Sequence, residues 1–117
     1  MLDVKGSIDR LLWTAEHHYL HIVAKHDFMR AWAVQFELAY TDFRTIQMAL
    51  QLDGNHADLL KKFAADYDQV FNYEYAFAAG GVDGFYTQYP NQSDLDAYKT
   101  AKDALEADIN QIQAING

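Results

Sequence analysis

Apolar residues recur at alternating steps of three and four along most of this 117-residue chain. This spacing places them on one face of an α-helix, and no stretch shows the sustained alternation that is typical of a β-strand. It predicts four amphipathic helices, over residues 8–26, 28–52, 56–79 and 94–115. Helices of this length with short links favour an all-α fold, an antiparallel four-helix bundle that spans residues 1–117 as a single domain.

The residues between the predicted helices are those that commonly start and end helices. Gly54 suits a helix end, and Ser93 suits the N-cap of the last helix. The segment 80–92, "GGVDGFYTQYPNQ", holds three of the six glycines and the only proline, and we expect a loop there. The break between the first two helices is the least marked. Asp27 could cap a new helix, or one very long first helix could continue through it and make a three-helix chain that packs against a partner.

Composition narrows the classes of function. Half of the residues are hydrophobic, and the chain has no cysteine, which excludes disulfides, zinc–thiolate sites and cysteine nucleophiles. The formal net charge of −8 disfavours nucleic acids and anionic lipids as partners. The first residues lack the pattern of a signal peptide, and no apolar run is long enough to span a membrane. We therefore expect a cytoplasmic protein with no membrane insertion.

Four of the five histidines lie in "EHHYLHIVAKHD", residues 16–27. On a helical wheel they separate into different environments. His26 points with the apolar core face, His18 lies at its boundary, and His17 and His21 lie on the opposite face. The segment is therefore not one cluster of ligands, and only His17 and His21 stay together.

A histidine pair four residues apart can place two imidazoles on one zinc ion, although zinc usually takes a third protein ligand. The chain resembles the haemerythrin-like bundles in its size and its histidine content. Metal sites in that family draw histidines and carboxylates from all four helices, whereas here only His56 lies outside the first helix and its exit. The resemblance therefore implies the architecture alone, and zinc at His17 and His21 remains an alternative to two solvated side chains.

The face that carries this pair also carries apolar side chains, which is unusual for a surface in contact with water. Its members are Trp13, His17, Leu20, His21 and Ala24. Either the first helix is covered on a second side, for example by the segment 80–92, or this face meets another chain. In a two-fold homodimer that crosses near His17, four imidazoles from the two copies would converge.

Two charged residues, Glu74 and Lys102, fall at apolar positions of the third and fourth predicted helices. In antiparallel helices they would lie at similar heights. Because an unpaired buried charge is costly, we expect a partly buried ion pair that fixes the register of the two helices. The alternative is that both side chains lie at the edge of the apolar stripe and reach water.

Aromatic residues concentrate over residues 67–89. Phe85, Tyr86 and Tyr89 fall in the predicted loop, where they either close one end of the bundle or form a binding patch. A small-ligand pocket among the aromatic residues near Tyr67 and Glu74 is a further alternative.

No catalytic set emerges from the sequence. Both serines suit helix caps, and the glycines of 80–84 lack the lysine and the preceding strand of a phosphate-binding loop. We therefore expect a small non-enzymatic protein that acts through protein–protein contacts, in a regulatory, accessory or immunity-type role suggested only by analogy of fold. The alternative is a bundle that binds a metal through His17 and His21, or a small ligand near Tyr67 and Glu74.

Overall fold

Four long helices build the part of the chain that the structure describes. The computed structural model describes residues 1–27 and 30–116, so the predicted start of the second helix at residue 28 falls outside it. Its helices are α1 (Lys5–Val23), α2 (Arg30–Asp53), α3 (Ala57–Gln88) and α4 (Gln92–Asn116). Each helix packs against the next one along the chain, and α4 packs back against α1. The predicted all-α antiparallel four-helix bundle is confirmed.

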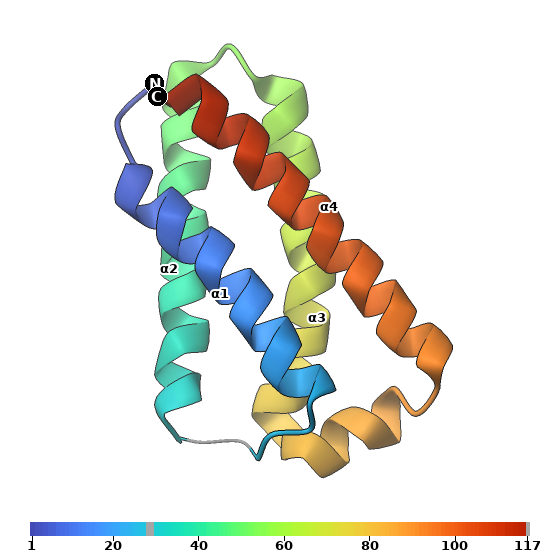
Figure 1. Ribbon diagram of the computed structural model, residues 1–117. Coiled ribbons are helices and arrows are strands. Elements are labelled where there is room, and N and C mark those ends of the chain that lie inside the picture. The colour runs from blue at the N-terminus through green and yellow to red at the C-terminus, as the bar shows by residue number, and fades with distance from the viewer. Residues whose placement is uncertain (28–29, 117) are drawn as a thin grey trace.

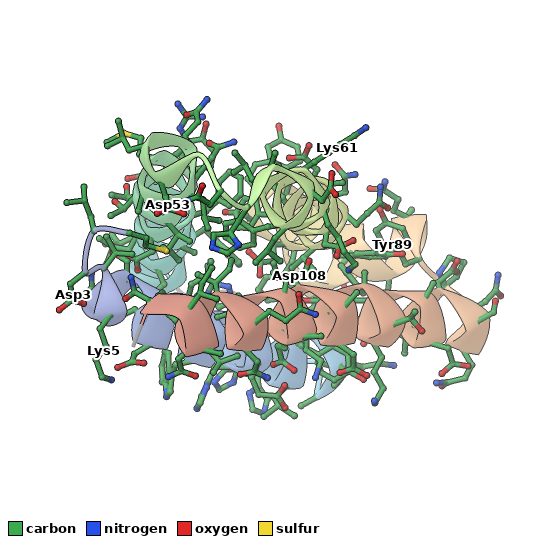
Figure 2. All side chains as sticks on the ribbon, turned by 90° about the horizontal axis from the view of Figure 1, so that it is seen from above. Asp3, Lys5, Asp53, Lys61, Tyr89 and Asp108 are labelled. Atoms are coloured by element: carbon green, nitrogen blue, oxygen red, sulfur yellow. The ribbon has the colours of Figure 1, made fainter. Side chains whose placement is uncertain are left out.

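The helices lie in two layers. Figure 1 shows α1 and α4 in front, crossing obliquely over α2 and α3 behind them. Figure 2 looks down on the same molecule from above and shows side chains of the two layers meeting between them. Both chain ends lie at the same end of the bundle, where the Val4 amide donates a hydrogen bond to the Asn116 side chain at 3.3 Å. This contact ties the end of α4 to the residues that precede α1.

The core lies between the layers and consists mostly of residues that the three-and-four spacing predicts. Its largest completely buried side chains are Phe63, Phe77, Phe85 and Tyr98. Burying one side chain of this size contributes about 1.5–3 kcal/mol, so the core is the main source of stability. The buried apolar residues form one face of each helix. None of the described helices is long and apolar enough to cross a membrane.

α1 ends at Val23, three residues before its predicted end. Lys25 adopts a left-handed conformation with φ 58°. The backbone amides of Lys25 and His26 donate to the carbonyl oxygens of Ile22 and His21, each at 3.1 Å. These two bonds form a Schellman motif, which terminates a helix. α1 and α2 are therefore separate helices, and the prediction that His26 points with the core is wrong, because His26 lies exposed beyond the end of α1.

α3 continues well past its predicted end at residue 79, because the chain bends at Gly81 and then resumes as a helix (Figure 1). Gly81 has φ 66° and ψ −161°, a conformation almost restricted to glycine. Beyond the bend, the apolar side chains recur at helical spacing and pack against the core: Val82, Phe85, Tyr86 and Tyr89. The predicted loop over 80–92 is therefore wrong for most of its length, and only residues 89–91 link α3 to α4.

Candidate functional site

The outer face of α1 carries the predicted interface residues Trp13, His17, Leu20, His21 and Ala24. Trp13 and Leu20 keep 52% and 48% of their surface exposed. The segment 80–92 does not cover them, because its Tyr86 hydroxyl reaches α1 only near the helix end, where it donates to the Ile22 carbonyl at 3.0 Å. Contact of this face with another chain remains a prediction.

The Trp13 indole is held in place on this open face. Its ring stacks on the His17 imidazole, with 3.8 Å between the centroids and 20° between the planes. The His17 Nδ1 lies 2.8 Å from the Trp13 carbonyl oxygen, so Nδ1 carries the hydrogen and donates it. The stack and the hydrogen bond together fix the imidazole beside the indole.

His17 and His21 have different hydrogen-bond partners, and a metal ion shared between them remains a prediction. The Nδ1 atoms of His21 and His26 lie 2.7 Å apart, so one ring donates to the other. Burial lowers the pKa of His21, and the nearby His26 and His17 lower it further. Within residues 1–27 and 30–116, no three His, Cys, Asp or Glu side chains are grouped in a way that could hold a metal ion.

Two hollows flank Trp13, one on each side of α1. The hollow toward α4 has a volume of about 490 Å³ and is lined by Asp9, Leu12, Trp13, Glu16, His17, Glu106 and Asn110. The hollow toward α2 is smaller and is lined by Arg10, Trp13, Thr14, Gln35, Leu38 and Asp42. The indole therefore stands between an acidic hollow and a mixed one.

The buried Lys102 side chain contacts two of the residues that line this acidic hollow, Glu16 and Glu106. Its side chain is only 6% exposed, and its Nζ lies 2.6 Å from Glu16, 2.9 Å from Asp103 and 3.3 Å from Glu106. Burial alone would lower the pKa of Lys102, but the hydrogen bonds with Glu16 and Asp103 outweigh it and raise that pKa. The ammonium therefore stays charged and joins α1 to α4.

The two glutamates that share Lys102 differ in their protonation. Burial and the contact with Glu16 raise the pKa of Glu106 to about 7. The same contact and the hydrogen bond from Lys102 lower the pKa of Glu16. Near neutral pH the pair therefore holds one proton for part of the time, on Glu106.

This proton has a measurable effect on stability. A carboxyl group whose folded-state pKa is raised stabilises the fold fully below its unfolded-state pKa, and the contribution disappears as the pH rises through the folded-state value. Because glutamine mimics the protonated carboxyl group, Glu106→Gln should increase the free energy of unfolding at about pH 8, and by much less at about pH 5. Water screens this partly exposed group, so the gain at about pH 8 should be only about 1–2 kcal/mol, below the value that the full pKa shift would give. Urea unfolding at the two pH values measures this difference.

The control for this prediction is Asp103→Asn, three residues earlier on α4. Hydrogen bonds from Lys99 and Lys102 lower the pKa of Asp103, so the charged form is the one that the fold favours. Removing that charge should therefore leave stability unchanged or slightly reduced at about pH 8. Equal gains for Glu106→Gln at both pH values would contradict the assignment of the raised pKa.

Glu74 and Lys102 are both buried, as their positions in the apolar stripes predict, but they are not each other's partners among the described ion pairs. The Glu74 carboxylate lies 3.3 Å from the His18 Nδ1. The expected Glu74–Lys102 pair is therefore corrected. α1 packs against both α3 and α4, and it places His18 beside Glu74 and Glu16 in an ion pair with Lys102.

The aromatic residues near Tyr67 and Glu74 pack on one another. The Tyr67 ring stacks on Phe43 at 4.0 Å between centroids, and the Tyr98 ring stacks on Tyr73 at 4.6 Å. Burial raises the pKa of both Tyr67 and Tyr98, and the charge of Glu74 raises it further. A ligand site near Tyr67 and Glu74 remains a prediction, and a hollow of about 590 Å³ lies beside Tyr40 and Phe71, which neighbour Tyr67.

The predicted patch of Phe85, Tyr86 and Tyr89 is not an exposed loop. Phe85 is completely buried, and the Tyr89 ring packs on Tyr73 with 4.8 Å between centroids. The Tyr86 ring is partly buried and carries the Lys25 ammonium 4.8 Å above its centroid. The three side chains close the end of the bundle beneath α1.

Two groups of residues stand outside the sequence-based expectations. Asp108 is completely buried, and its carboxyl group accepts a hydrogen bond from Lys62 at 2.8 Å. Burial and the neighbouring Asp66 raise the pKa of Asp108 to about 6. Asp108 lies three residues after Leu105 and four before Ile112, so its spacing is that of the buried stripe, and only its charged side chain argues against a core position.

The second group lies on the outer side of α2, where six uncharged residues form a row: Val34, Leu38, Thr41, Thr45, Met48 and Leu52. The signal for this row is present in the sequence. It is a second set of three-and-four steps within residues 28–52, offset from the set that fills the core. The set that fills the core contains more large apolar residues and therefore dominates the pattern of this segment.

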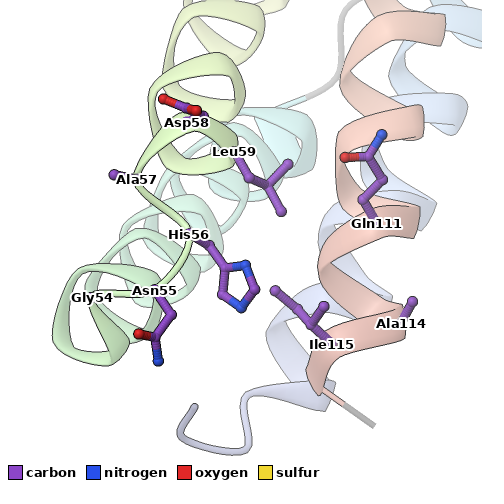
Figure 3. Close-up of a pocket in the computed structure, with 9 residues that line it drawn as sticks. All are labelled: Gly54, Asn55, His56, Ala57, Asp58, Leu59, Gln111, Ala114 and Ile115. Atoms are coloured by element: carbon purple, nitrogen blue, oxygen red, sulfur yellow. The ribbon is translucent and has the colours of Figure 1, made fainter.

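A further hollow, of about 660 Å³, opens at the opposite end from the bend in α3. Figure 3 shows His56, in the link between α2 and α3, extending toward Ile115 of α4 across this hollow. The His56 Nε2 lies 3.6 Å from the Asp53 carboxylate. The hollow is wide and has few charged groups, so it does not define a site for a particular ligand.

Comparisons with protein-family models, with curated proteins and with solved structures each found no match to this chain. Four-helix bundles serve many unrelated functions, so the architecture alone indicates none of them. The placement of the side chains is therefore the basis for a functional proposal.

Proposed function

We propose that this chain is a small non-enzymatic protein that acts by binding another protein through the outer face of α1. The observation that carries the proposal is the Trp13 indole, which is half exposed and yet held against His17. Tryptophan is prominent among the residues that dominate binding energy at protein interfaces. A side chain that is ordered before binding also loses little conformational freedom when the partner arrives. Binding would then be the whole activity, as in a regulatory, accessory or immunity-type role.

The surroundings of Trp13 indicate the chemistry of the partner. Carboxyl groups of Asp9, Glu16 and Glu106 line the hollow beside the indole, and the chain as a whole carries a formal charge of −8. Leu20 extends the apolar surface along α1. A helix with apolar side chains on one face and Lys or Arg beside them matches this arrangement, because its cations can approach the carboxylates and the indole face.

A synthetic amphipathic helix of leucine and lysine serves as the probe for this surface. We expect it to bind with a Kd on the order of 10 μM in isothermal titration calorimetry, and Trp13→Ala to weaken binding at least about tenfold. Raising NaCl from about 50 to about 300 mM should also weaken binding, because salt screens the attraction between the lysines and the carboxylates.

Two controls separate this surface from unspecific attraction. Tyr75→Ala removes an exposed aromatic side chain from α3 and should leave the Kd unchanged. A peptide of the same composition in scrambled order has the same charge but no apolar face, and it should bind at least about tenfold more weakly. Equal binding of the two peptides, no binding of either, or an unchanged Kd for Trp13→Ala would contradict the proposal.

A further inference from the structure

The outer row of α2 is an apolar surface that the fold of this chain does not use. Its four large side chains, Val34, Leu38, Met48 and Leu52, are between 55% and 72% exposed. The core side of α2 is formed by other residues, namely Ala39, Phe43, Ile46 and Leu50. In Figure 1, α2 lies at one edge of the molecule, where the first turns of α1 extend past it in front.

The spacing of the row is that of a helix that pairs with another helix. The steps from Val34 to Leu52 are four, three, four, three and four, so two successive heptads carry their a and d positions on the outer side. The two central positions are Thr41 and Thr45, and none of the six residues is charged. A solvated helix face ordinarily carries charges, and here they lie beside the row, at Glu37 and Arg44.

The order of residue types along the row is the same in both directions. Two large apolar residues are followed by two threonines and then by two large apolar residues, and the steps are symmetric as well. An antiparallel two-fold pairing sets each residue i against a residue j and that residue j against i, so this order brings apolar side chains against apolar ones and threonine against threonine. Centred at the height of Phe43, such a pairing sets Leu38 against Met48 of the second copy and Thr41 against Thr45.

We propose that α2 binds α2 of a second copy of this chain in an antiparallel pair around a two-fold axis. The row is complementary to itself in this orientation, which is the property that an interface between two copies needs. This inference does not rest on the proposed function, although Leu38 of the row also lines the hollow between Trp13 and α2.

The size of the surface sets the strength of the pairing. Eighteen residues at a rise of 1.5 Å give a row about 27 Å long. With a strip about 20 Å wide, the contact covers on the order of 550 Å² of each copy, below the about 800 Å² a side of a standard interface. We therefore expect a reversible dimer with a micromolar Kd. Because each copy carries a formal charge of −8, the dimer should be tighter at higher salt, unlike binding of the cationic peptide.

A charge exchange tests the predicted register directly. Sedimentation velocity between about 5 and 500 μM should show the wild-type chain passing from monomer to dimer. Leu38→Glu or Met48→Lys alone should weaken the dimer at least about 30-fold, because each sets two charges against apolar side chains. The double variant Leu38→Glu/Met48→Lys places each new glutamate opposite a new lysine of the other copy and should restore the Kd to within about fivefold.

Controls on other exposed positions locate the contact. Leu20→Glu on α1 and Tyr75→Glu on α3 should leave the dimer Kd unchanged, and circular dichroism should show that all variants remain folded. Leu20→Glu also separates the two proposals, since it removes apolar surface from the peptide site alone. A monomer at all concentrations, a dimer insensitive to Leu38→Glu, or single variants that the double variant does not rescue would each overturn the antiparallel pair.

Discussion

Replacing Lys102 with alanine should lower the free energy of unfolding by about 3 kcal/mol at neutral pH. The buried Lys102 ammonium contacts the carboxyl groups of Glu16, Asp103 and Glu106, all within 3.3 Å. Once the ammonium is removed, these carboxyl groups face one another without it in a partly buried region, which disfavours their charged forms. Urea unfolding followed by circular dichroism measures the loss.

The loss should also depend on pH. In the variant, the folded-state pKa of Glu106 should lie still further above its unfolded-state value, and the pKa of Glu16 should rise because it loses the lowering effect of Lys102. Stability is then lost as the pH rises through those folded-state values, so the variant should lose more at about pH 8 than at about pH 5. Protonation at the lower pH removes the repulsion that the ammonium balances in the wild-type chain.

Lys99→Ala provides the matched control. Lys99 lies three residues earlier on α4 and pairs with Asp103 at 2.8 Å, but its side chain is exposed. An exposed pair of this kind is screened by water and should contribute little to stability. Equal losses for the two lysine variants would contradict the conclusion that the buried ammonium joins α1 to α4.

Gly81→Ala should lower the free energy of unfolding by about 2 kcal/mol. The backbone at Gly81 has a conformation that an alanine side chain disfavours strongly. The bend there places Phe85 in the core and brings the Tyr86 hydroxyl to the Ile22 carbonyl. A chain that straightened at this point to accommodate alanine would lose both contacts. Thermal and urea unfolding measure the change.

Gly80, the preceding residue, provides the control. Alanine at Gly80 also replaces a flexible glycine but introduces no backbone strain, so it separates the two effects. A methyl group added at Gly80 meets no other atom within 4 Å, and its backbone does not have the positive φ of Gly81. Because alanine favours helices more than glycine does, Gly80→Ala should leave stability unchanged or raise it by up to about 1 kcal/mol. A comparable loss in both variants would show that the bend does not depend on the conformation of Gly81.

The spacing of apolar residues predicts the four helices and the faces that form the core. Phe63, Tyr67, Val70 and Phe77 belong to one predicted stripe, and all four are buried. This agreement has a simple cause, since each helix must turn its apolar face toward the others. The same reasoning predicts an exposed Trp13 if the face of α1 opposite the core stripe remains uncovered.

The spacing of apolar residues predicts less well which side chains pair between helices and where each helix ends. The stripes place Glu74 and Lys102 at the correct depth, but spacing within α3 and α4 does not reveal that α1 supplies their partners. The end of α1 depends on Lys25 in a left-handed conformation that glycine or asparagine usually adopts, so the sequence carries no sign of it. Conversely, the glycines of 80–84 suggest a loop, whereas only Gly81 bends the helix.

The terminal turns of α3 form a small structural unit of their own. They join the rest of α3 through a single bent residue, Gly81, and they are held by the Phe85 ring and by the Tyr86 hydroxyl on the last turn of α1. Such a unit can detach without separating the four long helices. Hydrogen exchange of the amides at 85–88 should therefore occur at one common rate, faster than in the centres of α3 and α4. The amides at the end of α1 should exchange in the same opening event. The bundle would then open in two cooperative steps, first the terminal turns of α3 and then the four long helices.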